Sequence, residues 1–254
     1  MKVINQLFFL SLLIGALAFT ACSEDIEREP SPVPTEGVQA YVYAESTSLT
    51  FVPTDALSFT LNVARQNAQE AATVHLQAEG EGFTLPETVD FAAGENVKQV
   101  LITFDIPIGT TSTLKVSVPE EESYVYANSE ITFTITLDYT WEDYGTGTYT
   151  SMLFGQSWPQ PIMKAKEANA YKLPDCITVG YPITFTLSDD GQELVAWDIQ
   201  ATGYEDSSYG MVYFLPESMQ RDGNVLIFAM QGLVVLDGGY GILYNGFSET
   251  LELP

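Results

Sequence analysis

Hydrophobic and polar side chains alternate one by one in several short runs between residues 38 and 138. The clearest runs cover residues 57–63 (LSFTLNV), 100–106 (VLITFDI) and 131–137 (ITFTITL). Successive side chains of a β-strand point to opposite faces, so a period of two predicts strands that bury one face and expose the other. Only Leu101 places an apolar side chain on the polar side of these runs.

Short segments that carry Gly or Pro separate the runs, for example residues 53–55 (PTD), 79–82 (EGEG) and 93–95 (AGE). About seven short strands over about 100 residues are typical of an immunoglobulin-like sandwich. We therefore predict an all-β chain with two antiparallel domains. The first, residues 38–138, is an Ig-like β-sandwich.

The stretch 87–104 (ETVDFAAGENVKQVLITF) resembles part of the Calx-β and related Ig-like modules. This resemblance implies the sandwich fold and a hairpin with Gly94 at its turn. The calcium-binding acids of that family have no clear counterpart in this sequence. The resemblance therefore implies the fold and not the ion.

Residues 139–254 contain further strand-like runs, such as 183–187 (ITFTL) and 232–236 (GLVVL), beside Asp-Gly pairs at 190–191, 222–223 and 237–238. Asp-Gly between such runs is a strong hairpin signal. We predict an antiparallel meander over 139–254, folded as a second β-sandwich or a barrel. Its opening, 141–155 (WEDYGTGTYTSMLFG), resembles the start of a small β domain in uncharacterised bacterial lipoproteins. Residues 163–171 (MKAKEANAY) form either a turn of helix or a strand with a loop.

The N-terminus has the pattern of a secretory signal over residues 1–21. Lys2 precedes an apolar run at 7–19 (LFFLSLLIGALAF), which is shorter than the about 20 residues that a membrane-spanning helix needs. Residues 20–22 (TAC) resemble the lipobox of bacterial lipoproteins, with Phe19 where that family usually has Leu. The resemblance implies that Cys22 is acylated on its sulfur and becomes the first residue of the mature chain.

The alternative for Cys22 is a plain secretory signal followed by a disulfide. Cys22 begins a segment, residues 22–37, that is rich in acids and prolines and cannot bury enough surface to hold a fixed geometry. We therefore interpret this segment as a lipidated flexible tether, and Cys176 as a lone buried thiol. Residues 23–25 (SED) resemble the surface-export signal of lipoproteins from Bacteroides-type bacteria. The expected location is the outer membrane, at the cell surface, with the lipid anchor as the contact to the membrane.

The charge of the chain argues against a nucleic-acid partner. The sequence has 34 acidic and 9 basic residues, and its formal net charge is −25. Without residues 1–21, which hold one basic and no acidic residue, the net charge becomes −26. A surface of this sign repels phosphate backbones, so we expect no nucleic-acid partner.

Candidate catalytic groups are few, and we expect no enzymatic activity, no cofactor and no metal. The one histidine, His75, lies in an alternating run where it points away from the core. Paired carboxylates at 142–143, 189–190 and 205–206 could supply a glycosidase acid and base. Adjacent pairs arise by chance in so acidic a chain, and strand neighbours point to opposite faces.

Aromatic residues concentrate in the second domain, where all three Trp and ten of the fourteen Tyr lie at or beyond Tyr139. Sugars stack their apolar C–H faces on aromatic rings, so an exported acidic β protein of this kind favours glycan binding. Trp197 lies on an apolar strand face and is expected in the core. The candidate ligand-binding residues are those expected on loops: Trp158, Tyr204, Tyr209 and Tyr240. They form one site if these loops gather at one end of the domain, and the alternative is that they are scattered surface residues.

These observations lead to one functional interpretation and one alternative. The first is a surface-anchored lipoprotein that acts as an accessory glycan- or ligand-binding protein, with a polysaccharide or a surface protein as its partner. The alternative is a structural or adhesive surface component, because tandem β-sandwiches on a lipid anchor also resemble fimbrillins. An enzyme is the third and least favoured class.

Overall fold

The computed structural model describes residues 36–254, and the predicted signal peptide, Cys22 and most of the predicted tether lie outside these residues. The described chain is built from strands, which confirms the all-β fold class. Its one helical element is a single 3₁₀ turn, η1 (Glu120–Glu122). None of its helices has the length and apolar character needed to cross a membrane.

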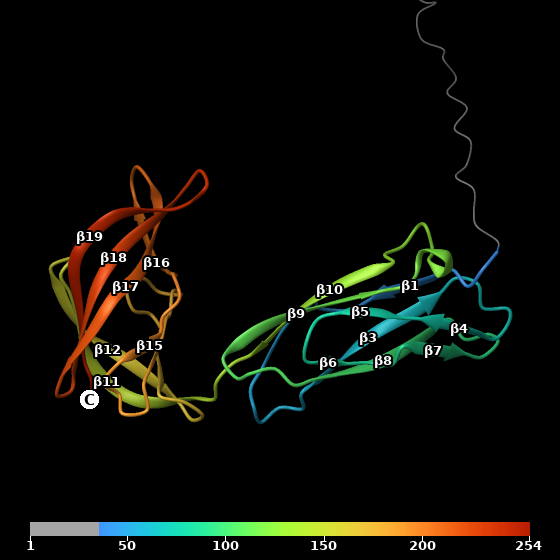
Figure 1. The fold of residues 1–254 in the computed structure, drawn as a ribbon, viewed down its shortest axis with the longest axis horizontal. Coiled ribbons are helices and arrows are strands. Elements are labelled where there is room, and N and C mark those ends of the chain that lie inside the picture. Colours follow the sequence, from blue (N-terminus) through green and yellow to red (C-terminus); the bar gives the residue numbers. More distant parts are fainter. Residues whose placement is uncertain (1–35) are drawn as a thin grey trace, which may run out of the picture. The chain divides into compact units, whose positions relative to one another are not determined.

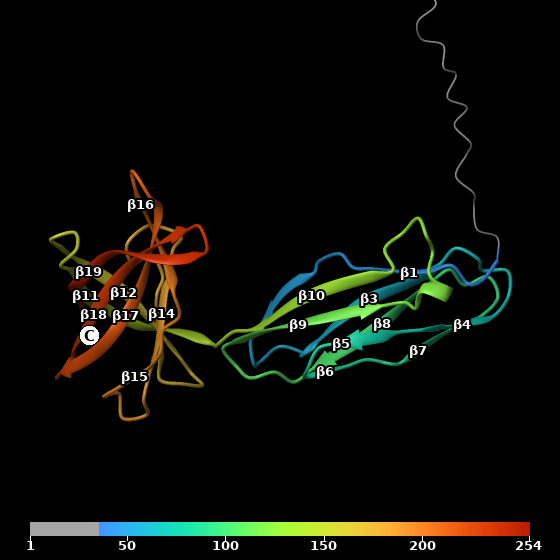
Figure 2. The ribbon, with the colours of Figure 1, turned by 45° about the horizontal axis from the view of Figure 1, so that its top comes forward.

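Residues 40–137 form two four-stranded sheets and one two-stranded sheet (Figures 1 and 2). The first sheet has the order β1 (Ala40–Tyr43), β3 (Ser58–Arg65), β8 (Val97–Phe104), β6 (Phe83–Thr84). The second has the order β2 (Ser48–Phe51), β10 (Glu130–Leu137), β9 (Thr110–Ser117), β5 (Gln77–Glu79). β4 (Ala72–His75) pairs with β7 (Thr88–Phe91). All pairings are antiparallel except β2 with β10, which is parallel.

The alternating runs predict the buried faces of these strands correctly. Phe59, Leu61 and Val63 of β3 are buried, and they share one hydrophobic core with side chains of β8 and β10. Leu101, the exception in the pattern, is 58% exposed on the outer face of β8.

The hairpin expected around Gly94 is wrong. β7 pairs with β4, whereas β8 pairs with β3 and β6, so the turn at 92–96 crosses between two sheets. Gly94 does occupy a turn with a φ of +89°. The residue pattern predicts a turn between two strands. It does not predict which strands pair, because pairing depends on how the strands pack in the core.

Residues 141–252 form one nine-stranded antiparallel sheet, which is curled (Figure 1). Its order is β15 (Leu194–Ala196), β14 (Ile183–Leu187), β13 (Ala170–Leu173), β12 (Gln156–Ala165), β11 (Trp141–Ser151), β19 (Gly239–Glu252), β18 (Val225–Leu236), β17 (Gly210–Asp222), β16 (Gln200–Asp206). The Asp-Gly signals fall at turns between β14 and β15, β17 and β18, and β18 and β19. Residues 163–171 are strand, loop and strand rather than helix.

The curl of this sheet brings strands from its two ends together. The side-chain amide of Gln200, on β16, accepts a hydrogen bond from the Thr184 backbone N–H at 2.7 Å and donates to the Thr184 carbonyl at 2.7 Å. Thr184 lies on β14, near the other end of the sheet order. The inner face of the sheet buries its own hydrophobic core, which includes Trp197 as predicted. Trp197 follows the end of β15, however, and does not lie on an apolar strand face, since Val195 and Ile199 are exposed.

Candidate ligand-binding site

The sequence places Trp158 on a loop, and the structure corrects this prediction. Trp158 lies on β12 and pairs with Tyr149 of β11, and their ring centres are 5.1 Å apart. Pro159 and Pro161 favoured the loop, but β13 pairs with β12 only beyond both prolines. At both prolines, the edge of β12 that faces away from β11 is therefore unpaired. A proline has no backbone N–H, and none is required at an unpaired edge.

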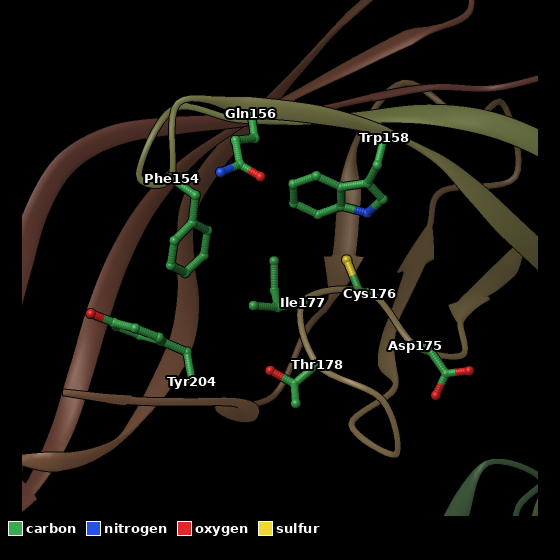
Figure 3. Close-up of a pocket in the computed structure, with 8 residues that line it drawn as sticks. All are labelled: Phe154, Gln156, Trp158, Asp175, Cys176, Ile177, Thr178 and Tyr204. Carbon is green, nitrogen blue, oxygen red and sulfur yellow. The ribbon is translucent and has the colours of Figure 1, made fainter.

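A pocket of about 470 Å³ opens beside the Trp158 indole. Figure 3 shows the rings of Phe154, Trp158 and Tyr204 around one space, with the amide of Gln156 directed into it. The opposite wall is the loop between β13 and β14, which contributes Asp175, Cys176, Ile177 and Thr178. Aromatic walls with a few polar groups are typical of small-molecule sites.

Contacts behind the pocket hold its aromatic rings in place. The indole N–H of Trp158 donates to the side-chain oxygen of Gln160 at 3.1 Å. The rings of Phe154 and Tyr204 meet edge to face, with centres 5.1 Å apart. Both walls are therefore shaped without a ligand, which reduces the entropy that binding would cost.

Gly203 allows the loop after β13 to lie against β16. It has a φ of +74°, and a Cβ there would come within 2.4 Å of the Tyr181 ring and 2.5 Å of the Thr178 side chain. Any other residue would push this loop away from Tyr204 and widen the pocket. A glycine inside a strand often marks such a close approach, but the prediction of a loop here concealed this signal.

Three buried ionisable side chains, Cys176, Tyr149 and Glu249, interact beneath the pocket, and Cys176 lines it. Glu249 is fully buried and accepts a hydrogen bond from Ser151 at 2.8 Å. Its second carboxylate oxygen and the Tyr149 hydroxyl have no hydrogen-bond partner in this geometry, although the two side chains interact electrostatically. Burial raises the pKa of Glu249 to about 7.

The thiol of Cys176 is free and buried, which confirms the interpretation of this residue as a lone buried cysteine. Burial raises the pKa of this thiol far above its ordinary value. The protonated thiol is a poor nucleophile, because the thiolate is the reactive form. Cys176 therefore acts as part of the pocket wall.

The structure brings together two of the four predicted ligand-binding residues. Trp158 and Tyr204 both line the pocket, but Tyr204, like Trp158, lies on a strand, β16, and not on a loop as predicted. Tyr209 lies at the turn between β16 and β17 and is 53% exposed, outside the pocket lining. Tyr240, at the start of β19, packs against Tyr213 with ring centres 5.2 Å apart and is also outside it.

Sequence reasoning missed the polar residues of the pocket. Gln156 and Thr178 carry no local pattern that distinguishes them from other surface residues. Asp175 follows Pro174 and accepts a hydrogen bond from the Gly180 backbone N–H at 2.7 Å, which explains its place in the loop. Its carboxylate is directed away from the aromatic rings (Figure 3).

Several of the candidate catalytic groups have structural partners outside the pocket. The His75 side chain is 57% exposed, as predicted, and its Nδ1 contacts Glu122. Glu142 pairs with Lys166 at 2.8 Å. Asp190 and Asp206 accept hydrogen bonds from the backbone of their own turns. Within residues 36–254, no three His, Cys, Asp or Glu side chains gather in a way that could hold a metal ion.

Comparison with known proteins gives distant likenesses only. No family model matches the chain, and no curated protein matches it. A protein of unknown function from Bacteroides ovatus is 9% identical, with 84% of this chain and 89% of that chain covered and a TM-score of 0.42. A multidomain protein including DUF1735, also from Bacteroides ovatus, is 12% identical, with coverages of 84% and 92% and a TM-score of 0.40. CBD12 from CALX1.2 is 11% identical, with coverages of 79% and 82% and a TM-score of 0.32.

Proposed function

We propose that residues 141–252 bind a neutral glycan, or a ligand of the same chemistry, in the pocket beside Trp158. The observation that carries this proposal is the meeting of three aromatic rings with the Gln156 amide and the Thr178 side chain around one space. Aromatic faces suit the C–H faces of a sugar, and amide and hydroxyl groups suit its hydroxyls. The volume of about 470 Å³ is within the range of small-ligand pockets.

The net charge and the N-terminus support an accessory role for this protein at the cell surface. A formal charge of −25 disfavours an anionic polysaccharide, so the proposed ligand is uncharged. In this proposal Cys22 carries the lipid that anchors the protein in the outer membrane. The domain binds its ligand without converting it, and the neutral Cys176 thiol in the pocket wall agrees with this role.

Retention on gels that contain neutral polysaccharides, such as a β-glucan, a xylan or a mannan, tests the proposal. Gln156→Ala should abolish most of the retention that the wild-type protein shows, because Gln156 is an exposed polar group of the pocket. Gln192→Ala is the matched control, since Gln192 is exposed on a turn outside the pocket. Both variants should keep the wild-type melting temperature.

Ligand binding should also change the fluorescence of Trp158, which gives a second readout in solution. Tyr204→Ala should remove this change, whereas Tyr209→Ala should preserve it, since Tyr209 lies outside the pocket lining. The proposal is wrong if no gel retains the protein, or if Gln156→Ala and Tyr204→Ala bind as tightly as the wild type.

A further inference from the structure

Four tyrosines form a connected row of rings on the first domain. Tyr41 and Tyr43 are stacked, with centres 6.2 Å apart and planes at 25°. Tyr124 lies 6.2 Å from Tyr41, and Tyr126 lies 5.6 Å from Tyr124. We name this row the tyrosine platform. None of its residues belongs to the pocket beside Trp158.

The platform lies on the outer face of the sheet that contains β1. Ala40 and Val42 of β1 point into the core, so Tyr41 and Tyr43 between and beside them point outward. β1 is an edge strand of its sheet, and the segment after η1 runs along its outer edge. There the Tyr124 backbone N–H donates to the Ala40 carbonyl at 2.8 Å. This contact places Tyr124 beside Tyr41 and extends the aromatic row past the edge strand.

The platform is exposed although it is aromatic. Tyr43 is 41% exposed, Tyr126 is 50% exposed, and their neighbour Val125 is 68% exposed. Buried rings would need no further explanation, because a core normally contains them. Tyr41 and Tyr124 are partly buried between these exposed neighbours. A cluster of aromatic rings in contact with one another and partly open to solvent indicates an interaction surface.

Amide side chains continue the platform across the sheet. Tyr43 pairs with Asn62 of β3, and Asn62 pairs with Gln99 of β8. Cross-strand partners point to the same face, so one ring and two amides form a row at right angles to the strands. Gln99 is exposed and Asn62 is half-buried, which leaves both amides able to meet a ligand laid over the face.

We propose that the tyrosine platform is a second carbohydrate-binding surface, which holds an extended, neutral polysaccharide chain laid across the strands. The exposed rings of Tyr43 and Tyr126 offer apolar surface for sugar units, and the amides of Asn62 and Gln99 offer donors and acceptors for hydroxyl groups. No cationic side chain belongs to the row, and the net charge of −25 opposes an anionic chain. This inference shares its ligand class with the proposed function but rests on other residues.

The test measures retention of the full chain on the same neutral polysaccharide gels. Tyr43→Ala and Gln99→Ala should each weaken retention about tenfold, equivalent to about 1.4 kcal/mol. Tyr43→Phe keeps the ring and should retain the protein nearly as well as the wild type. Leu101→Ala is the control, because Leu101 is also exposed on β8 but lies outside the row of Tyr43, Asn62 and Gln99.

The outcomes separate this surface from the pocket. Loss in Tyr43→Ala with full retention in Gln156→Ala supports the platform and contradicts the pocket. Loss in Gln156→Ala with full retention in Tyr43→Ala and Gln99→Ala overturns the platform and leaves the pocket standing. Equal loss in Tyr43→Ala and Leu101→Ala also overturns the platform, because the effect would then be general to this sheet.

Discussion

Residues 40–137 bury one arginine side chain and residues 141–252 bury one glutamate side chain, and the surroundings of these two side chains differ. Arg65, on β3, is 2% exposed and donates to the backbone carbonyls of Glu95, Glu70 and Ala92 at 2.7–2.8 Å. Its guanidinium also lies over the Phe91 ring, at 5.0 Å. Glu249 has one oxygen bonded to Ser151 and the other without a hydrogen-bond partner.

The difference shows two ways to bury an ionisable group. Arginine stays charged at any ordinary pH, so the fold surrounds it with acceptors and uses it to fix the crossing turn at 92–96. A carboxyl group can become neutral, and burial raises the pKa of Glu249 to about 7. Three hydrogen bonds therefore stabilise the buried Arg65 in its charged form, whereas burial favours the protonated, neutral form of Glu249.

The largest expected effect comes from removing the buried charge of the first domain. Arg65→Met keeps much of the side-chain volume but leaves three backbone carbonyls without their donor, at about 1–3 kcal/mol each before relaxation. We expect an overall loss of about 4 kcal/mol in the free energy of unfolding of this domain. Urea unfolding followed by far-UV circular dichroism should show an early transition.

Tryptophan fluorescence localises the effect of Arg65→Met, because all three Trp lie at or beyond residue 141. The fluorescence transition should stay near that of the wild type. Arg221→Met is the matched control, since Arg221 also donates to two backbone carbonyls but is only half-buried. If both variants lose stability equally, the contrast between a buried and a half-exposed guanidinium disappears.

The second effect is pH-dependent and concerns Glu249. Its pKa in the folded state, about 7, exceeds its ordinary value of 4.5, so the folded state binds the proton more tightly. The stability that this provides is complete below about pH 4.5 and is lost as the pH rises through 7, by about 3 kcal/mol in total. Glu249→Gln should remove this dependence, because the amide is neutral throughout.

Urea unfolding monitored by tryptophan fluorescence at pH 5 and pH 8 measures this contrast. The free energy of unfolding of the wild type should be lower at pH 8 than at pH 5, whereas that of Glu249→Gln should be the same at both pH values. Glu252→Gln removes an exposed carboxylate from the same strand and should follow the wild type. A wild-type protein equally stable at both pH values would show that the Glu249 carboxyl ionises without cost.

The sequence contained a signal for both buried charges. Arg65 continues the alternation of Leu61 and Val63, and Glu249 lies between Phe247 and Leu251 with the same period. A charged residue at a core position of a period-two pattern predicts a buried, partnered group. What the pattern lacks is the identity of the partners, because the carbonyls around Arg65 come from residues up to 30 positions away.

Strands were predictable from local alternation, and turns from Asp-Gly pairs, since both depend on neighbouring residues. The pocket was predictable only in part. Trp158 and Tyr204 were found by residue type. Gln156 lies two positions before Trp158 on the same face of β12, which the loop prediction for Trp158 concealed, and Thr178 comes from the loop between β13 and β14. The tyrosine platform was missed because its rings come from residues about 80 positions apart, joined across the free edge of β1.

The smallest expected effect tests what holds the curled sheet together. In residues 40–137, apolar faces of separate sheets pack on each other, whereas residues 141–252 must bring the ends of one sheet together. Gln200 makes three hydrogen bonds to Thr184, two of them to its backbone. Gln200→Met keeps the length of the side chain and should cost about 1–2 kcal/mol.

Hydrogen exchange of the Thr184 amide gives the decisive measurement, because the Thr184 backbone N–H donates its hydrogen bond to the Gln200 side chain. The amide should exchange faster in Gln200→Met, and the tryptophan fluorescence transition should move to slightly lower urea. Gln231→Met removes an amide bonded only to the exposed Glu217 carboxylate and should change neither readout. Unchanged exchange at Thr184 in Gln200→Met would mean that the buried core alone holds the curl, and the two domains would then be stabilised by apolar packing in the same way.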